Sequence, residues 1–191
     1  ETFYLDENHT EIVPFMKQGK SVNYFEDELA KVIELPYSGG DLSMLILLPQ
    51  KISGITELEK QFDPELYRKY LDKMFPKEVK MAIPRFKLEA KYDLNKPLQS
   101  LGMKSAFSGR ADFSGMTGKK NLFLSKVAHK SFIEVNEEGT EAAAATGAVM
   151  QKTALVRKVE FKADHPFLFL IKDNSTQAIL FLGRLSNPPR H

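Results

Sequence analysis

Residues 137–150 are Glu137-Glu138-Gly139-Thr140-Glu141-Ala142-Ala143-Ala144-Ala145-Thr146-Gly147-Ala148-Val149-Met150. Alanine is the best helix former and a poor strand former, so local propensity predicts a short helix with Thr140 as its N-cap. Two glycines, Gly139 and Gly147, bracket the alanines, and residues 151–158 follow neither the helical nor the strand period. Small side chains between two glycines equally suit a segment that slides into a crowded place without clashes. The residues by themselves leave both interpretations open.

Upstream of this segment the sequence predicts strands. Residues 2–14 alternate roughly between apolar and polar side chains, and residues 29–35 and 42–48 are two apolar runs. Proline and glycine in residues 36–41 supply the turn between these two runs. Met44–Leu48 has no polar face, so we expect a central strand that is buried on both sides.

The remaining elements alternate between helical and strand periods. Residues 55–74 repeat an apolar side chain every four positions, which predicts one or two amphipathic helices broken at Asp63-Pro64. The same rules predict a strand at 79–88, a helix at 94–101 ended by Gly102 and a loop at 112–120. They also predict strands at 122–135, 167–171 and 178–182. A polar turn at 172–177 joins the last two strands. The pattern therefore predicts an α+β fold with mainly antiparallel sheets and few helices.

Composition excludes several classes of function. The chain has 191 residues, of which 27 are basic and 25 acidic, and no run of five or six like charges occurs, so no nucleic-acid partner is expected. There is no cysteine, which excludes disulfides, thiolate zinc sites and cysteine nucleophiles. The 4 histidines show no metal-ligand spacing, so neither a metal nor another cofactor is predicted.

The sequence also bears on location. No signal peptide opens the chain, and no apolar stretch reaches the roughly eighteen residues that a membrane span needs, so no membrane partner is expected. Asn8-His9-Thr10 and Asn174-Ser175-Thr176 fit the N-glycosylation sequon, which makes Asn8 and Asn174 acceptors in a secreted chain. We expect a secreted, extracellular glycoprotein.

Residues Glu137–Thr146 resemble the hinge of the reactive-centre loop in inhibitory serpins. Four further motifs resemble the family in the family's order: Ala111–Met116, Leu124–Lys130, Asp164–Ile171 and Ile179–Arg184. The resemblance covers the whole chain, although a complete serpin is about twice as long. The chain is therefore identified as the C-terminal half of a single serpin domain, residues 1–191, with a reactive-centre loop at about 137–160 and with part of the central sheet outside it.

The resemblance implies an inhibitor that is not itself an enzyme. A target serine protease attacks the loop and forms an acyl-enzyme, and the hinge, Glu137–Ala145, then inserts into the central sheet and traps the protease through a conformational change. The implied partners are this protease and the N-terminal half of the same serpin. The alternative is a non-inhibitory serpin acting as a carrier, storage protein or chaperone, whose hinge would contain bulky, charged or proline residues in place of Thr140 and the alanines.

The family's spacing also locates the reactive bond. Fourteen residues after Gly139 the cut falls between Thr153 and Ala154, and a small β-branched residue at Thr153 suits an elastase-like protease. If the register slips by one residue, Lys152 becomes the recognised residue and the protease becomes trypsin-like.

Three more residues acquire roles by resemblance. His129 is interpreted from its predicted strand as a core histidine, and the resemblance makes it the histidine beneath the strands that open during loop insertion. Arg85 and Glu137 correspond to a pair that forms a salt bridge at the base of the loop in some relatives.

Overall fold

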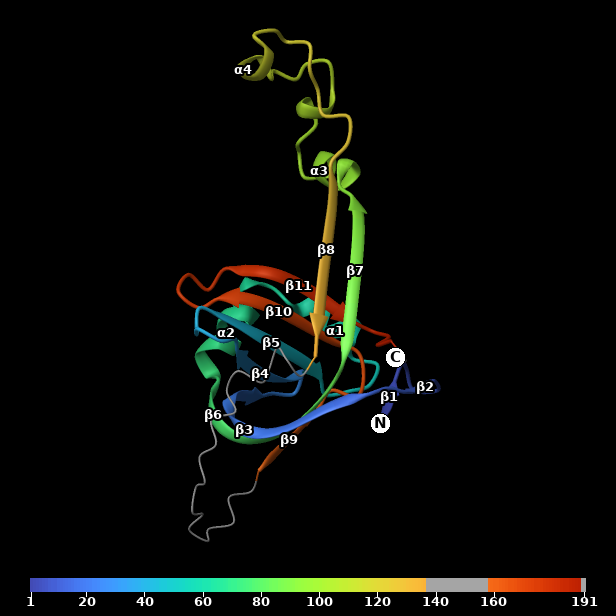
Figure 1. Cartoon of the computed structure of the whole chain (residues 1–191), viewed down its shortest axis with the longest axis vertical. Coiled ribbons are helices and arrows are strands. Elements are labelled where there is room, and N and C mark those ends of the chain that lie inside the picture. Colours follow the sequence, from blue (N-terminus) through green and yellow to red (C-terminus); the bar gives the residue numbers. More distant parts are fainter. Residues whose placement is uncertain (137–157, 190–191) are drawn as a thin grey trace. The chain divides into compact units, whose positions relative to one another are not determined.

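The structure, a computed structural model, describes residues 1–136 and 158–189. The chain forms two compact units, one comprising Glu1–Phe86 and the part from Val135 onwards, the other comprising Lys87–Glu134 (Figure 1). The hinge, the reactive bond and the alternative helix beginning at Thr140 all lie outside the described residues.

The first unit is built on a seven-stranded sheet with the strand order β11-β10-β5-β4-β3-β6-β9. Its strands are β3 (Phe15–Glu26), β4 (Ala30–Pro36), β5 (Leu42–Pro49), β6 (Phe75–Pro84), β9 (Val159–Lys162), β10 (Phe167–Asp173) and β11 (Ile179–Leu185). All neighbours pair antiparallel except β6 and β9, which are parallel. A small sheet of β1 (Thr2–Tyr4) and β2 (Thr10–Ile12) adjoins it in sequence. The predicted α+β fold is confirmed.

Strand β5 lies inside the sheet, between β10 and β4. Met44–Leu48 is buried throughout, so the expectation of a central strand is confirmed. The turn before β5 forms where it was predicted, because Gly39 and Gly40 adopt positive φ angles of 91° and 78° that other residues avoid. Tyr37 N donates to Leu42 O at 2.9 Å and closes this turn.

Two helices, α1 (Ile55–Gln61) and α2 (Pro64–Lys73), follow β5 and are separated where the sequence predicted. The carboxylate of Asp63 accepts a 2.8 Å hydrogen bond from Leu66 N and caps α2, and Pro64 occupies the first turn, where its missing N–H costs nothing. Leu58, Tyr67 and Tyr70 pack with apolar side chains of β4, β5 and β10 to form the core on that face of the sheet.

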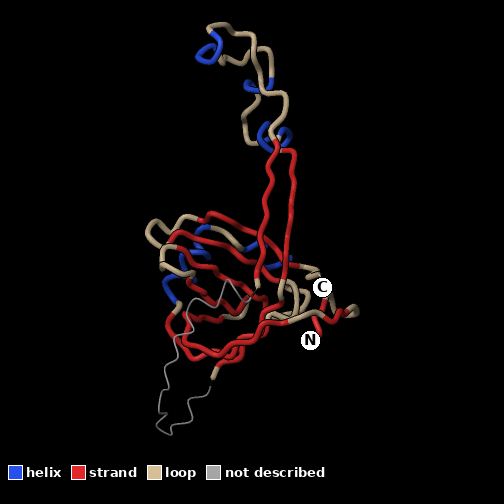
Figure 2. Tube along the Cα trace, in the orientation of Figure 1, coloured by secondary structure: helices blue, strands red, loops and turns tan. Residues whose placement is uncertain are grey.

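The second unit contains most of a two-stranded sheet of β7 (Phe86–Asp93) and β8 (Ala128–Val135). Between these strands lie α3 (Asn95–Ser100), a 3-10 turn (Ser105–Phe107) and α4 (Ser114–Thr117), joined by loops (Figure 2). Gly102 follows α3 with a φ of 103°, which suits the end of a helix.

Three sequence predictions need correction here. Residues 79–88 are not one strand, because the chain divides after Pro84 and Arg85 N donates to Pro14 O at 3.0 Å instead of continuing the sheet. The strand predicted at 122–135 begins only at Ala128, since Leu124 N donates to Ala106 O of the 3-10 turn and Val127 N donates to Oδ1 of Asn95. The loop predicted at 112–120 contains the short helix α4.

Two strands were not predicted from the sequence. Strand β3 is a long strand whose polar residues, including Lys17 and Lys20, and Gly19 interrupt the alternation of apolar side chains. Strand β9 has only Val159 and Phe161 as apolar residues, which is too short a pattern to recognise.

Candidate functional site

The segment that the sequence marks as functional leaves the described structure after Asn136, at the end of β8, and returns at Lys158, just before β9. Asn136 and Lys158 are therefore the two described attachment points of the site. The return point belongs wholly to the first unit and is fixed by several independent contacts.

Strand β9 is held firmly to the sheet. It runs parallel to β6 with Val159 opposite Val79 and Lys162 opposite Ala82, and the ring of Phe161 is completely buried. Beyond the strand, Ala163 N donates to Ala82 O at 2.8 Å. Burial of an aromatic ring contributes several kcal/mol, so the chain after residue 157 has a firm anchor.

His165 fixes the chain just after this anchor. Its imidazole is buried, with Nε2 2.8 Å from the carbonyl oxygen of Pro49 and Nδ1 3.0 Å from Oδ1 of Asp164. A carbonyl only accepts, so Nε2 carries a proton. Burial alone would raise the pKa of Asp164, but the contact with His165 and the charge of Lys162 outweigh burial and lower that pKa. A backbone hydrogen bond also holds this part of the chain, because Tyr4 N donates to Asp164 O at 2.7 Å.

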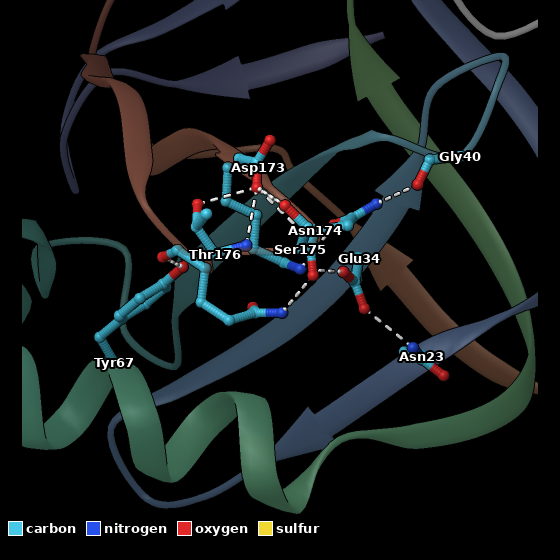
Figure 3. A network of polar contacts seen from close by, with 10 residues as sticks. Asn23, Glu34, Gly40, Tyr67, Asp173, Asn174, Ser175 and Thr176 are labelled. Atoms are coloured by element: carbon cyan, nitrogen blue, oxygen red, sulfur yellow. Dashed lines mark hydrogen bonds and ion pairs between the residues drawn. The ribbon is translucent and has the colours of Figure 1, made fainter.

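A buried ion pair joins β10 to β4 across β5. Figure 3 shows its carboxylate, Glu34, together with Asn23 and Asn174. Lys172 Nζ lies 2.9 Å from Oε1 of Glu34, and the side chain of Lys172 is only 4% exposed. Asn23 Nδ2 donates to Oε2 of Glu34 at 2.8 Å, while Lys172 Nζ also donates to Oδ1 of Asn174 at 2.7 Å. Asn174 Nδ2 in turn donates to Gly40 O at 2.7 Å. Both charges are therefore paired and hydrogen-bonded, as buried charges require.

The turn after β10 is organised by one carboxylate. Oδ1 of Asp173 accepts hydrogen bonds from the N–H and hydroxyl groups of both Ser175 and Thr176, at 2.7–3.0 Å. These hydrogen bonds stabilise the ionised form and lower the pKa of Asp173 to about 2. The sequence placed Lys172 in this polar turn, but it lies within β10 and is buried, so that boundary was wrong. Its position directly after the apolar run of β10 was the one available signal.

The other residues singled out from sequence are dispersed. His129 lies on β8 with an exposed side chain, so its interpretation as a core histidine is not supported by its surroundings in the second unit. Arg85 is exposed between β6 and β7, while its predicted partner Glu137 lies outside the described residues, as do Lys152, Thr153 and Ala154.

Comparison with known proteins places these features in one family. A family model described as Serpin (serine protease inhibitor) matches residues 1–188. Leukocyte elastase inhibitor of Bos taurus is 49% identical over 97% of this chain and 52% of its own length, and Serpin B10 of Papio anubis is 48% identical over 91% and 45%. The solved structure of uncleaved ovalbumin is 33% identical, with a TM-score of 0.85 over 98% of this chain and 48% of ovalbumin. The chain spans about half the length of the curated relatives it matches.

These relatives correct the expected location. Leukocyte elastase inhibitors and serpin B proteins are intracellular serpins of clade B, so the prediction of a secreted, extracellular glycoprotein is wrong. The sequons were a weak basis for it, since the Asn174 amide already bonds to Gly40 O and its Oδ1 to Lys172. Within the described ranges, no helix has the length and apolar character needed to cross a membrane.

Proposed function

The chain belongs to the serpin family, and on this premise we propose that the protein of which it forms part inhibits a serine protease by acting as a suicide substrate. The protease's serine oxygen bonds to the carbonyl carbon of Thr153, the Thr153–Ala154 peptide bond breaks, and the freed amine of Ala154 leaves with a proton. The hinge then inserts into the central sheet before the acyl-enzyme hydrolyses. On this proposal the protein is not an enzyme, and the leukocyte elastase inhibitors among its relatives are named as inhibitors.

The observation that carries the proposal is the chemistry of the hinge. In an inserted strand Thr140, Ala142 and Ala144 share the side that faces the sheet's interior, where small uncharged groups cost little. Glu141 falls on the opposite side, next to solvent. No proline or other residue that would block insertion occupies the three inward positions. The same composition argues against the carrier, storage and chaperone alternative.

The length of the loop fits the same mechanism. Gly139 to Thr153 is fifteen residues. In extended form a segment of that length spans roughly 50 Å, which is enough to move a bound protease across a domain. The firm anchor of β9 keeps Lys158 and the residues after it in place while the part before the cut moves.

The target class follows from the residue before the cut. Thr153 suits the small primary pocket of an elastase-like protease, and the names of the leukocyte elastase inhibitors agree with that choice. Cleavage after Lys152 instead would indicate a trypsin-like target.

The N-terminal half of the same protein is the second proposed partner. Four successive side chains of β11, Ile179, Leu180, Phe181 and Leu182, are 39–56% exposed, which is an apolar surface that a complete domain would cover. The missing half would also supply most of the sheet that receives the hinge. The roles of His129 in sheet opening and of an Arg85–Glu137 ion pair at the loop base remain proposals that need that half.

Incubating the full-length protein with elastase, trypsin and chymotrypsin tests the proposal. We expect an SDS-stable complex with elastase and a cut between Thr153 and Ala154, identified by mass spectrometry of the released C-terminal fragment. Ala142→Arg places a charge on the inward side and should convert the inhibitor into a substrate that is cleaved without complex formation. Glu141→Arg is the matched control and should keep the complex. Cleavage of the wild-type loop by every protease without a complex would refute the proposal.

A further inference from the structure

A groove of about 530 Å³ lies on the first unit beside the point where the loop returns to the sheet. Its lining comes from β3, β6 and β9 and from Glu1 at the start of the chain: Glu1, Lys17, Gln18, Gly19, Lys80, Met81, Ala82, Lys158, Glu160 and Lys162. Lys158 is the first described residue after the loop segment, so the groove is continuous with the loop's end.

Register explains why the groove forms on this face. Val79 and Met81 of β6 are buried, so the residues that alternate with them, Lys80 and Ala82, point to the outer face. Gly19 is paired with Lys80, and a side-chain carbon added at Gly19 would meet no atom within 4 Å. Small residues therefore leave open space in the middle of the strands, and lysines border it.

The groove carries a net positive charge that the protein itself does not neutralise. Its lining has four lysines and two glutamates, which leaves a net charge of +2. Glu1 pairs with Lys17 and lies 3.5 Å from Lys162 Nζ, so these two ammonium groups are satisfied. Among the described residues, Lys80 and Lys158 have no ion pair. Lys80 stands opposite Glu160 in the register of β6 and β9, but no ion pair joins these two described residues. Both exposed ammonium groups therefore remain available to an external carboxylate.

The lining favours a polypeptide over a polyanion. A uniformly charged sulfated glycan would meet the carboxylates of Glu1 and Glu160 as well as the lysines. A protein segment that combines acidic side chains with neutral hydrogen-bonding groups accommodates both signs. The flat floor at Gly19 and Ala82 also admits an extended backbone, which a bulkier surface would exclude.

We infer that this groove docks an acidic polypeptide segment through Lys80 and Lys158. Only the identity of the partner rests on the proposed function. A protease that attacks the loop lies beside the loop's return point, so we assign the acidic segment to the protease surface outside its active-site cleft. Such contacts accelerate association more than they strengthen the final complex, because charge complementarity steers the encounter.

Direct binding tests the groove without any protease. A fluorescent peptide of five Ser-Glu repeats is titrated into the full-length protein at low salt, with a Ser-Gln peptide as the neutral control. The Lys80→Glu/Lys158→Glu variant should bind the acidic peptide about 2- to 30-fold more weakly, as the loss of two exposed ion pairs implies. A Lys51→Glu/Lys60→Glu variant changes net charge equally at exposed lysines on and near α1 and should bind like wild type. Equal weakening in both variants, or stronger binding of a heparin-derived octasaccharide than of the peptide, would overturn the inference.

Inhibition kinetics test the identity of the partner. The protease that the wild-type protein traps is used in its native form and after succinylation, which converts surface lysines into carboxylates. We expect succinylation to raise the association rate constant of wild type and of the Lys51→Glu/Lys60→Glu control, and to raise it several-fold less in the groove variant. The same gain in all three proteins would exclude contact between groove and protease. Failure of the wild-type protein to trap any protease would refute the proposed function. The peptide titration would then test, independently of that function, whether the groove binds an acidic polypeptide.

Discussion

The seven-stranded sheet carries two groups of charged side chains that differ in burial. Glu34 and Lys172 are enclosed between β4 and β10, and every charged atom there has partners. Lys80 on β6 and Lys158 just before β9 are exposed beside the loop's return point and have no ion pair among the described residues. The two groups therefore have different roles in the same sheet. Paired and buried charges fix the arrangement of strands, whereas exposed charges are available to a partner.

Removing one partner of the buried pair should have the largest effect. Glu34→Ala leaves the ammonium of Lys172 buried without its carboxylate, and we expect the free energy of unfolding of the full-length protein to fall by about 3–5 kcal/mol. Urea denaturation followed by fluorescence measures the change. Glu160→Ala, at an exposed carboxylate of the groove, serves as the control and should change stability by less than about 0.5 kcal/mol. Similar losses in both variants would mean that burial does not distinguish the two groups.

Acid should weaken the buried group selectively. Burial alone would raise the pKa of Glu34, but the hydrogen bond from Asn23 and the ammonium of Lys172 outweigh it, so the pKa in the folded protein is lowered. A lowered pKa contributes stability that is present above the unfolded-state pKa of about 4.3 and is lost as pH falls through the folded-state value. The fall in Tm between pH 7 and pH 3 should therefore be smaller in Glu34→Gln than in wild type. An identical fall in both proteins would contradict the role assigned to this carboxylate.

The smallest effect is expected beside the groove. Lys162 is partly exposed and lies 3.5 Å from Oδ2 of Asp164, so Lys162→Met, which keeps the apolar stem, should change the free energy of unfolding by less than about 1 kcal/mol. Added salt should reduce the difference further, because exposed pairs are screened. A loss comparable to that of Glu34→Ala, measured in the same denaturation assay, would show that the ion pairs around β9 hold the strand in place.

Period and turn chemistry predicted much of the fold. The central strand β5, the break between α1 and α2 at Asp63 and the hairpin of β10 and β11 each follow from a local pattern that burial or capping later satisfies. Strand β3 was not predicted because its polar side chains hide the alternating pattern of a strand. Backbone pairing with β6, which the sequence does not reveal, holds it in the sheet. The family motifs predicted the class of function, while the hinge and the reactive bond lie outside the described residues.

The polar features could not be predicted in the same way. Lys172 reaches Glu34 from a strand two places away in the sheet, and a separation of more than a hundred residues leaves no periodic trace. The groove likewise depends on Gly19 of β3, Lys80 of β6 and Lys158 just before β9. Both require the register of the sheet, which no single segment contains.

The parallel pairing of β6 with β9 also has a consequence for the protein's synthesis. Val159 follows Pro84 by 75 positions, so the ribosome must add all of these residues before β6, already paired with β3, can acquire its second neighbour. At a translation rate of about 5–20 residues per second, the nascent chain carries an open β6 edge for about 4–15 s. An unpaired edge recruits other strands, so this interval is where molecular chaperones would be needed most.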